Sequence, residues 1–241
     1  MSLSIRISIL AITTCFGAAA HFAWLETEAK RLQVGQTTKV KIGFGHEVGN
    51  SESAINLDGL ELFAISPSGK KVALNPVAAD KWVVADFTAT ETGVYRFVMT
   101  QDRGVMSQTT KGFKPGGRDV YPDAKKSMKM WRSAVTYVSA GGDQGHAASL
   151  GLPFEVMAQR EGSKVLLTVL QGGRPFPNAE ISLNVPGQEE ANKIGVSNQM
   201  GNFEYKVPGP GPNLFLVTTA SPAPPGANYD TENLTSVLVI Q

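Results

Sequence analysis

Alternation of apolar and polar residues with a period of two constrains the fold of this chain more than any other feature. The alternation is clear in residues 38–44, 60–65 and 94–99, and again in residues 164–170 and 179–183. Successive side chains of a β-strand point to opposite faces of the sheet, so this pattern indicates half-buried strands. Short strands separated by turns are typical of β-sandwiches. The sequence therefore predicts an all-β fold.

Turn sequences support this reading of the first half. Residues 66–70 read Ser-Pro-Ser-Gly-Lys, in which proline fixes φ and glycine permits positive φ. Residues 90–99 then follow the order turn, glycine, apolar residue and alternating aromatic residues. That order is the pattern of a late strand in an immunoglobulin-like sandwich.

The second half carries a different pattern. Residues 172–183 and 197–205 combine a proline-containing turn, a strand and a glycine hairpin. Their order resembles the transthyretin-like or carboxypeptidase-regulatory-like sandwich modules of exported proteins. We therefore expect two immunoglobulin-like/transthyretin-like β-sandwich domains, over residues 21–145 and 146–241, joined by the glycine-rich stretch that ends at His146.

The middle of the chain is ambiguous. Residues 112–119 are rich in glycine and are expected to form a loop. Residues 125–139 contain apolar side chains at spacings that fit neither period cleanly. They are read as a short helical turn that runs into a strand.

Residues 1–20 read as a secretory signal peptide. Arg6 supplies the positive charge, residues 7–16 form the apolar segment, and Ala18-x-Ala20 is a small-residue cleavage site. Cleavage after Ala20 would make His21 the first residue of the exported chain. Its α-amine and imidazole would then be two neighbouring nitrogen ligands, which a metal ion can deprotonate near neutral pH.

Two alternatives remain open in this leader. Cleavage after Ala19, with Gly17 at the −3 position, would leave Ala20 ahead of His21. The single cysteine, Cys15, is a poor match to a lipid-attachment site, because the residue before it is threonine. If the leader is removed, no thiol or disulfide remains, which suits an oxidising compartment such as the periplasm.

Charge and hydropathy exclude several classes of function. The 22 basic and 21 acidic residues nearly balance, so nothing favours a nucleic acid or an anionic membrane surface as partner. Beyond the leader, no stretch approaches the 18 apolar residues of a membrane span. Nucleotide-binding and nucleophile-elbow motifs are also absent from the sequence.

What remains for site chemistry is the set of three histidines, His21, His46 and His146. His46 follows an expected strand, and His146 closes the glycine-rich connection. Loops at strand ends are where sandwiches place binding groups. Nitrogen-rich ligand sets suit nickel, copper or zinc, so the histidines predict a site for a divalent transition metal.

Acidic and sulfur side chains near the histidines are further candidates. Asp143, Glu47 and Glu26 are carboxylates that can ligate the metal or orient a histidine. Met128 and Met130 are possible ligands for Cu(I). A strand with methionine at every second position is more typical of a core.

Several short motifs together resemble a periplasmic family of unknown function. Its members are associated with nickel and cobalt uptake, as the soluble component beside an energy-coupling-factor-type transporter. His21 and His46 lie in the matching stretches. The motifs that carry the resemblance are residues 20–26, 43–47, 117–125, 150–156, 173–179 and 201–203.

The resemblance implies two β-sandwich domains, export to the periplasm, and binding and delivery of a divalent transition metal. We therefore expect a periplasmic protein that binds nickel, cobalt or copper and hands the ion to an inner-membrane transporter. Two other functions stay open. A terminal His21 with a second histidine is the arrangement of a copper histidine brace, found in oxidative enzymes that are also exported β-sandwiches. Alternatively, the chain is an interaction module that binds no metal.

Overall fold

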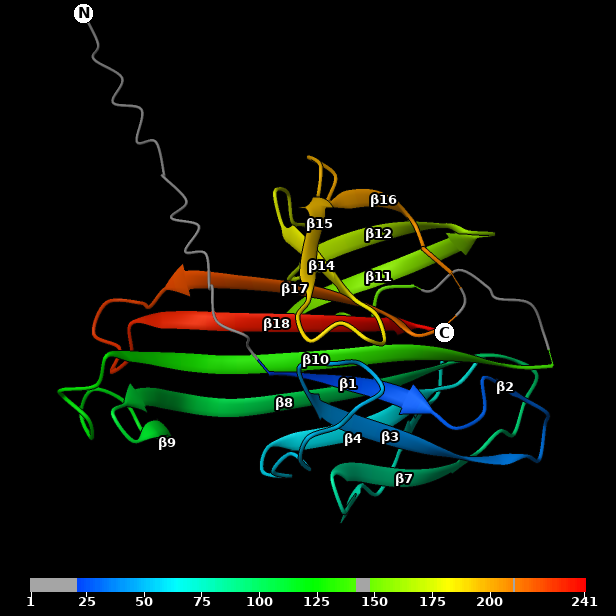
Figure 1. The fold of residues 1–241 in the computed structure, drawn as a ribbon, viewed down its shortest axis with the longest axis horizontal. Coiled ribbons are helices and arrows are strands. Elements are labelled where there is room, and N and C mark those ends of the chain that lie inside the picture. The colour runs from blue at the N-terminus through cyan, green and yellow to red at the C-terminus, as the bar shows by residue number, and fades with distance from the viewer. Residues whose placement is uncertain (1–20, 142–147, 210) are drawn as a thin grey trace, which may run out of the picture.

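The computed structural model describes residues 21–141, 148–209 and 211–241 of the 241-residue chain. All regular elements in these ranges are strands, which confirms the predicted all-β sandwich class (Figure 1). No helix in this part of the chain is long and apolar enough to cross a membrane. The predicted leader, residues 1–20, and the predicted ligands Asp143 and His146 lie outside the described residues.

The strands form three sheets. The first has the order β1 (Phe22–Thr27), β3 (Thr37–Gly45), β7 (Trp82–Thr88) and β6 (Val77–Ala79). The central sheet has the order β15 (Asn192–Val196), β14 (Glu180–Asn184), β17 (Asn213–Pro222), β18 (Thr231–Ile240), β10 (Lys126–Ala140), β8 (Gly93–Thr109), β4 (Leu60–Ile65) and β5 (Lys71–Ala73), with β2 (Arg31–Leu32) on β10 and β9 (Gly112–Pro115) on β8. The third consists of β11 (Phe154–Glu161), β12 (Lys164–Gln171), β13 (Arg174–Pro175) and β16 (Asn202–Lys206).

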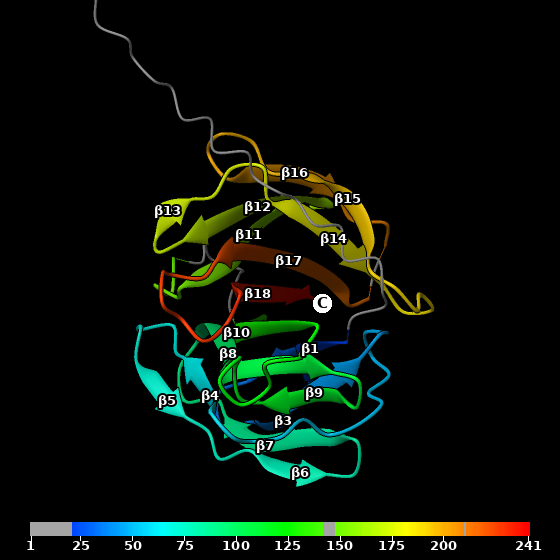
Figure 2. The ribbon, with the colours of Figure 1, turned by 90° about the vertical axis from the view of Figure 1, so that its left-hand side faces the viewer.

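The central sheet connects the two halves of the chain. Its middle is a parallel pair, in which β18 from the end of the chain lies beside β10. Figure 2 shows β11 and β12 at one end of the molecule and β3 and β7 at the other, with β18 and β10 between them. The division into domains at residue 145 stays a prediction, and the segments on either side of it share this one sheet.

Both faces of the central sheet are buried, each in a separate hydrophobic core. On β8, Phe97 belongs to the core shared with the first sheet, whereas Val98 belongs to the core shared with the third. Ala134 and Val135 on β10 divide in the same way. The two sandwiches therefore use opposite faces of the same strands, as the two-residue period of a strand allows.

The helical turn expected within residues 125–139 is wrong, because this segment forms the single long strand β10. A strand that is buried on both faces loses its simple alternation, and its apolar spacing can then resemble that of a helix. The loop expected at residues 112–119 is also partly wrong. Its first residues form the short edge strand β9.

The strands β8 and β10 run past the beginning of β1 (Figure 1). They carry a β-bulge near that point: Trp131 lies opposite Asp102 and Met130 lies opposite Gly104. Arg103 is therefore the extra residue on β8. A bulge locally changes the direction of the side chain that it carries. This bulge lies in the central sheet, which packs against β1.

Candidate metal centre

Two of the predicted ligands, His21 and His46, meet where β1 begins and β3 ends. The last pair in the antiparallel register is Phe22 opposite Gly45. One step further, His21 comes opposite His46. Opposite residues of an antiparallel pair point to the same face, and the two imidazole centroids lie 4.0 Å apart.

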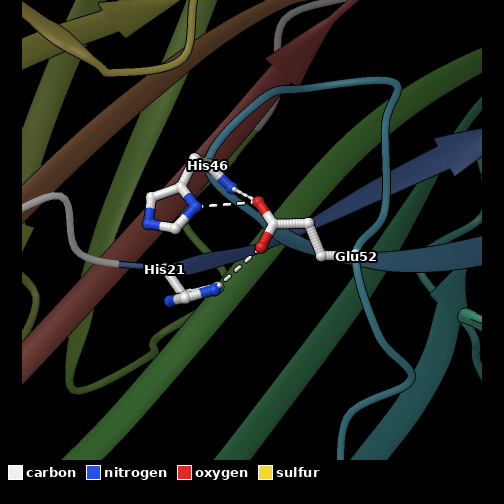
Figure 3. Close-up of side chains that lie close together, drawn as sticks. All are labelled: His21, His46 and Glu52. Carbon is white, nitrogen blue, oxygen red and sulfur yellow. Dashed lines mark hydrogen bonds and ion pairs between the residues drawn. The ribbon is translucent and has the colours of Figure 1, made fainter.

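Glu52 completes the cluster from the loop that follows β3. The loop turns back on the strand, and the Glu52 amide donates to the Phe44 carbonyl over 2.9 Å. The Glu52 carboxylate then accepts three hydrogen bonds (Figure 3). His21 Nε2 donates over 3.0 Å, His46 Nδ1 over 2.7 Å and the His46 amide over 3.0 Å.

A glycine at position 45 makes room for this carboxylate. A Cβ built on Gly45 would lie 2.9 Å from Glu52 Oε1 and 3.0 Å from Glu52 Cγ. Real Cβ atoms are not found this close to another heavy atom. Any larger residue at position 45 would therefore push the carboxylate away from the two imidazoles.

A buried amide fixes the loop to the second half of the chain. Asn184, on β14, is fully buried and makes three hydrogen bonds. Its Oδ1 accepts from the Val48 amide over 2.8 Å, and its Nδ2 donates to the carbonyls of His46 and Gln188 over 3.2 and 2.9 Å. Buried polar groups in such networks hold one backbone arrangement, so Asn184 orients His46.

The electrostatics keep Glu52 ionised. Hydrogen bonds from the ring and the backbone amide of His46 are the largest causes that lower the pKa of Glu52, which falls to about 2. Two imidazoles and one carboxylate offer ligand atoms that all lie within 4.8 Å of one another. This is the size and composition of a first coordination sphere for a transition-metal ion, with two nitrogens and one oxygen.

The structure places two of the predicted carboxylates, Glu47 and Glu26, outside the cluster. Glu47 accepts hydrogen bonds from the Gly187 amide over 2.7 Å and from Asn50 Nδ2 over 3.4 Å. Glu26 accepts from the indole nitrogen of Trp24 over 2.6 Å. Neither carboxylate belongs to the cluster that the described residues form, and their assignment as ligands stays a prediction.

Sequence reasoning missed Glu52. The feature that could have indicated Glu52 is the turn between His46 and Glu52. In this turn Gly49 has a φ of +90° and Glu47 forms a β-bridge with Asn50. A tight turn at this point returns the chain to the strand end, so the second glutamate of the loop faces the histidines. The turn chemistry was readable, but the choice between the two glutamates depends on the packing against β14.

Fold and site together define the class: an all-β protein in which two histidines, His21 and His46, and one glutamate, Glu52, converge where two neighbouring strands meet. The family model for a domain of unknown function, DUF4198, matches residues 18–221, and the chain belongs to this family. No curated protein matches the chain.

Two solved structures are among those that match. A DUF4785 family protein from Legionella pneumophila is 12% identical with a TM-score of 0.32, covering 82% of this chain and 52% of its own. The chain thus spans about half the length of that protein. A segment of two fibronectin type III domains from chicken tenascin is 12% identical with a TM-score of 0.24, covering 89% of this chain and 96% of its own. At these scores neither likeness supports a functional argument.

Proposed function

We propose that this protein binds a divalent transition metal in the periplasm, namely nickel, cobalt or copper, and supplies it to an inner-membrane uptake system. The observation that carries the proposal is the convergence of His21, His46 and Glu52, whose ligand atoms lie within 4.8 Å of one another. The metal is the cargo of the protein in this proposal.

The ligand chemistry supports a transition metal over calcium or magnesium. Imidazole nitrogen suits nickel, copper, cobalt and zinc, whereas calcium and magnesium prefer sets made only of oxygen. The side chains of His21 and Glu52 are each 43% exposed and that of His46 is 26% exposed. An ion can therefore enter and leave without unfolding of the site, as delivery to a partner requires.

Three protein ligands leave one position open on a tetrahedral ion and three on an octahedral ion. If the exported chain begins at His21, its α-amine can occupy one of them. The transporter is included in the proposal because the family that this chain resembles is associated with nickel and cobalt uptake.

Isothermal titration of the exported chain with Ni(II), Co(II), Cu(II) and Zn(II) tests the proposal. We expect binding tighter than about 10 µM for at least one of the first three ions, and its loss in His21→Ala, His46→Ala and Glu52→Gln. Glu47→Gln is the matched control, because it removes the same charge from the same loop at a carboxylate outside the cluster. Equal binding by the Glu47 and Glu52 variants would contradict the site.

A copper histidine brace is the second candidate, and the 4.0 Å separation of the two imidazoles favours it. In a brace, the amine and imidazole of a terminal His21 chelate copper together with His46. Oxidation of a polysaccharide by the copper-loaded protein, dependent on a reductant, would support this enzyme. Copper binding without such oxidation would favour the role in metal supply.

A further inference from the structure

Two arginines of the central sheet lie close to one another, and one of them, Arg132, contacts the same aromatic ring as His21. Arg132 is on β10, and Arg103 is the extra residue of the bulge on β8. Their guanidinium groups are close enough for the charge of Arg103 to lower the pKa of Arg132. Within residues 21–141, 148–209 and 211–241, neither group forms an ion pair.

A neutral amide orients Arg132. Gln101 Oε1 accepts from Arg132 Nε over 2.9 Å and from Nη2 over 2.6 Å. Gln101 is itself fixed, since its Nε2 donates to the carbonyls of Asn56 and Asp58 over 2.7 and 2.8 Å. This scaffold sets the direction of the guanidinium but brings no negative charge. Among the described residues, Nη1 of Arg132 has no hydrogen-bond partner.

Burial makes the positive charge costly at this position. Burial is the main cause that lowers the pKa of Arg132 to about 9, and the charge of Arg103 adds to it. Burial also lowers the pKa of Arg103. A pair of partly buried like charges without a counter-ion is unfavourable unless an anion neutralises it.

The arginine pair and the metal centre are linked by one aromatic ring. The Arg132 guanidinium lies 5.2 Å from the centroid of Phe44. The same ring stacks on His21 with centroids 5.1 Å apart. Because Arg132 and His21 both contact the Phe44 ring, the guanidinium lies about one ring away from the candidate metal centre, within reach of a small multidentate ligand on the metal ion.

We propose that Arg103 and Arg132 bind a carboxylate of a small organic acid that chelates the metal, so that the cargo is a metal–carboxylate chelate. The metal part of this inference rests on the proposed function. A guanidinium matches a carboxylate through parallel, charge-assisted hydrogen bonds. A divalent ion beside Glu52 leaves a net positive centre, and a chelator with several carboxylates neutralises both this centre and the arginine pair.

Citrate is the probe, because it binds Ni(II) with some of its oxygens and leaves a carboxylate to reach the arginines. Three titrations of the exported chain are compared: Ni(II) alone, citrate alone and the one-to-one Ni(II)–citrate complex. We expect Ni(II)–citrate to bind the wild-type protein about tenfold or more tightly than it binds Arg103→Gln or Arg132→Gln. Binding of Ni(II) alone is expected to change by less than about threefold in both variants.

Arg160→Gln is the matched control, since its guanidinium donates to the carbonyls of Gly162 and Gln241, away from the cluster. Arg103→Gln keeps the test decisive if Arg132→Gln does not fold, because Arg103 makes no hydrogen bond within the described residues.

If Ni(II) binds alone but both arginine variants bind Ni(II)–citrate as the wild type does, this inference is overturned and the proposed function stands. If none of Ni(II), Co(II) and Cu(II) binds alone, while citrate alone binds and loses affinity in the arginine variants, the proposed function fails and the carboxylate site stands.

Discussion

Gly45→Ala is the substitution that separates the geometry of the proposed metal centre from the stability of the fold. Gly45 has no positive φ, so alanine fits the backbone. Its Cβ, however, would lie 2.9 Å from Glu52 Oε1, and ordinary van der Waals contact begins at 3.4 Å. The carboxylate must therefore move by about 0.5 Å or more, which exceeds the tolerance of a preorganised site.

This movement acts directly on the hydrogen bond from His46 Nδ1, now 2.7 Å long. A displacement of this size along the bond takes it to the outer limit for such a bond. Because the displaced group is the end of a flexible side chain, the free energy of unfolding should change by no more than about 0.5 kcal/mol. The metal affinity should fall by about tenfold, as when a group that holds a ligand in place is disturbed.

The assay pairs isothermal titration of Ni(II) or Cu(II) with urea unfolding of the same metal-free samples. Gly209→Ala is the control, because a Cβ at Gly209 would meet nothing within 4 Å and its φ is not positive. Unchanged metal affinity in Gly45→Ala, with the control also unchanged, would refute the role given to the Glu52 carboxylate. A large loss of stability in Gly45→Ala would show that the carboxylate is not free to move.

The same part of the molecule gives three further predictions. Because the pKa of Glu52 is lowered in the folded state, its interactions with the two histidines stabilise the fold above pH 4.5, the ordinary pKa of a glutamate. This stabilisation is lost as the pH falls toward 2. Glu52→Gln should therefore flatten the acid side of a profile of unfolding free energy against pH, measured with urea. Asn184→Ala removes the three hydrogen bonds of a buried amide and should cost about 2–3 kcal/mol of unfolding free energy, with weaker metal binding because the His46 carbonyl loses its anchor. Gly43→Ala places a Cβ 2.4 Å from the Trp24 ring and should cost about 1–3 kcal/mol by overpacking, seen as a lower thermal midpoint.

Local sequence patterns predicted several of the longer strands, because a strand with one polar face shows its period directly. The expected strand at residues 60–65 coincides with β4, and that at residues 38–44 lies within β3. The parallel pairing of β10 with β18 could not be read in this way. It joins residues about a hundred positions apart, and no local pattern in either strand specifies its partner.

Residue chemistry alone predicted two members of the candidate site, the histidines. The third member, Glu52, is set by how the loop after β3 packs, which the sequence does not show. Histidine is rare in this chain; His21 stood out because it follows the expected cleavage site, and His46 because it follows an expected strand. The two histidines lie opposite each other because β1 and β3 pair in the sheet. This pairing could not be predicted from the sequence. Glu52 was missed in favour of Glu47, since only the hydrogen bond from the Gly187 amide shows that Glu47 is directed away.

Arg103 and Arg132 illustrate the same limit. Each is an ordinary charged residue in the sequence. Their proximity requires both the register of β8 with β10 and the bulge between them. Their relation to the metal centre depends further on the contact of Arg132 with Phe44 across two sheets.

A crystal structure of a chain that begins at His21, soaked with Ni(II) and measured with anomalous data at the nickel edge, would show directly whether the metal binds at the proposed centre. We predict an anomalous peak bonded to imidazole nitrogens of both His21 and His46 at about 2.0–2.1 Å and to a carboxylate oxygen of Glu52 at about 2.0–2.2 Å. A fully loaded protein whose nickel lies away from these three side chains would contradict the proposed site.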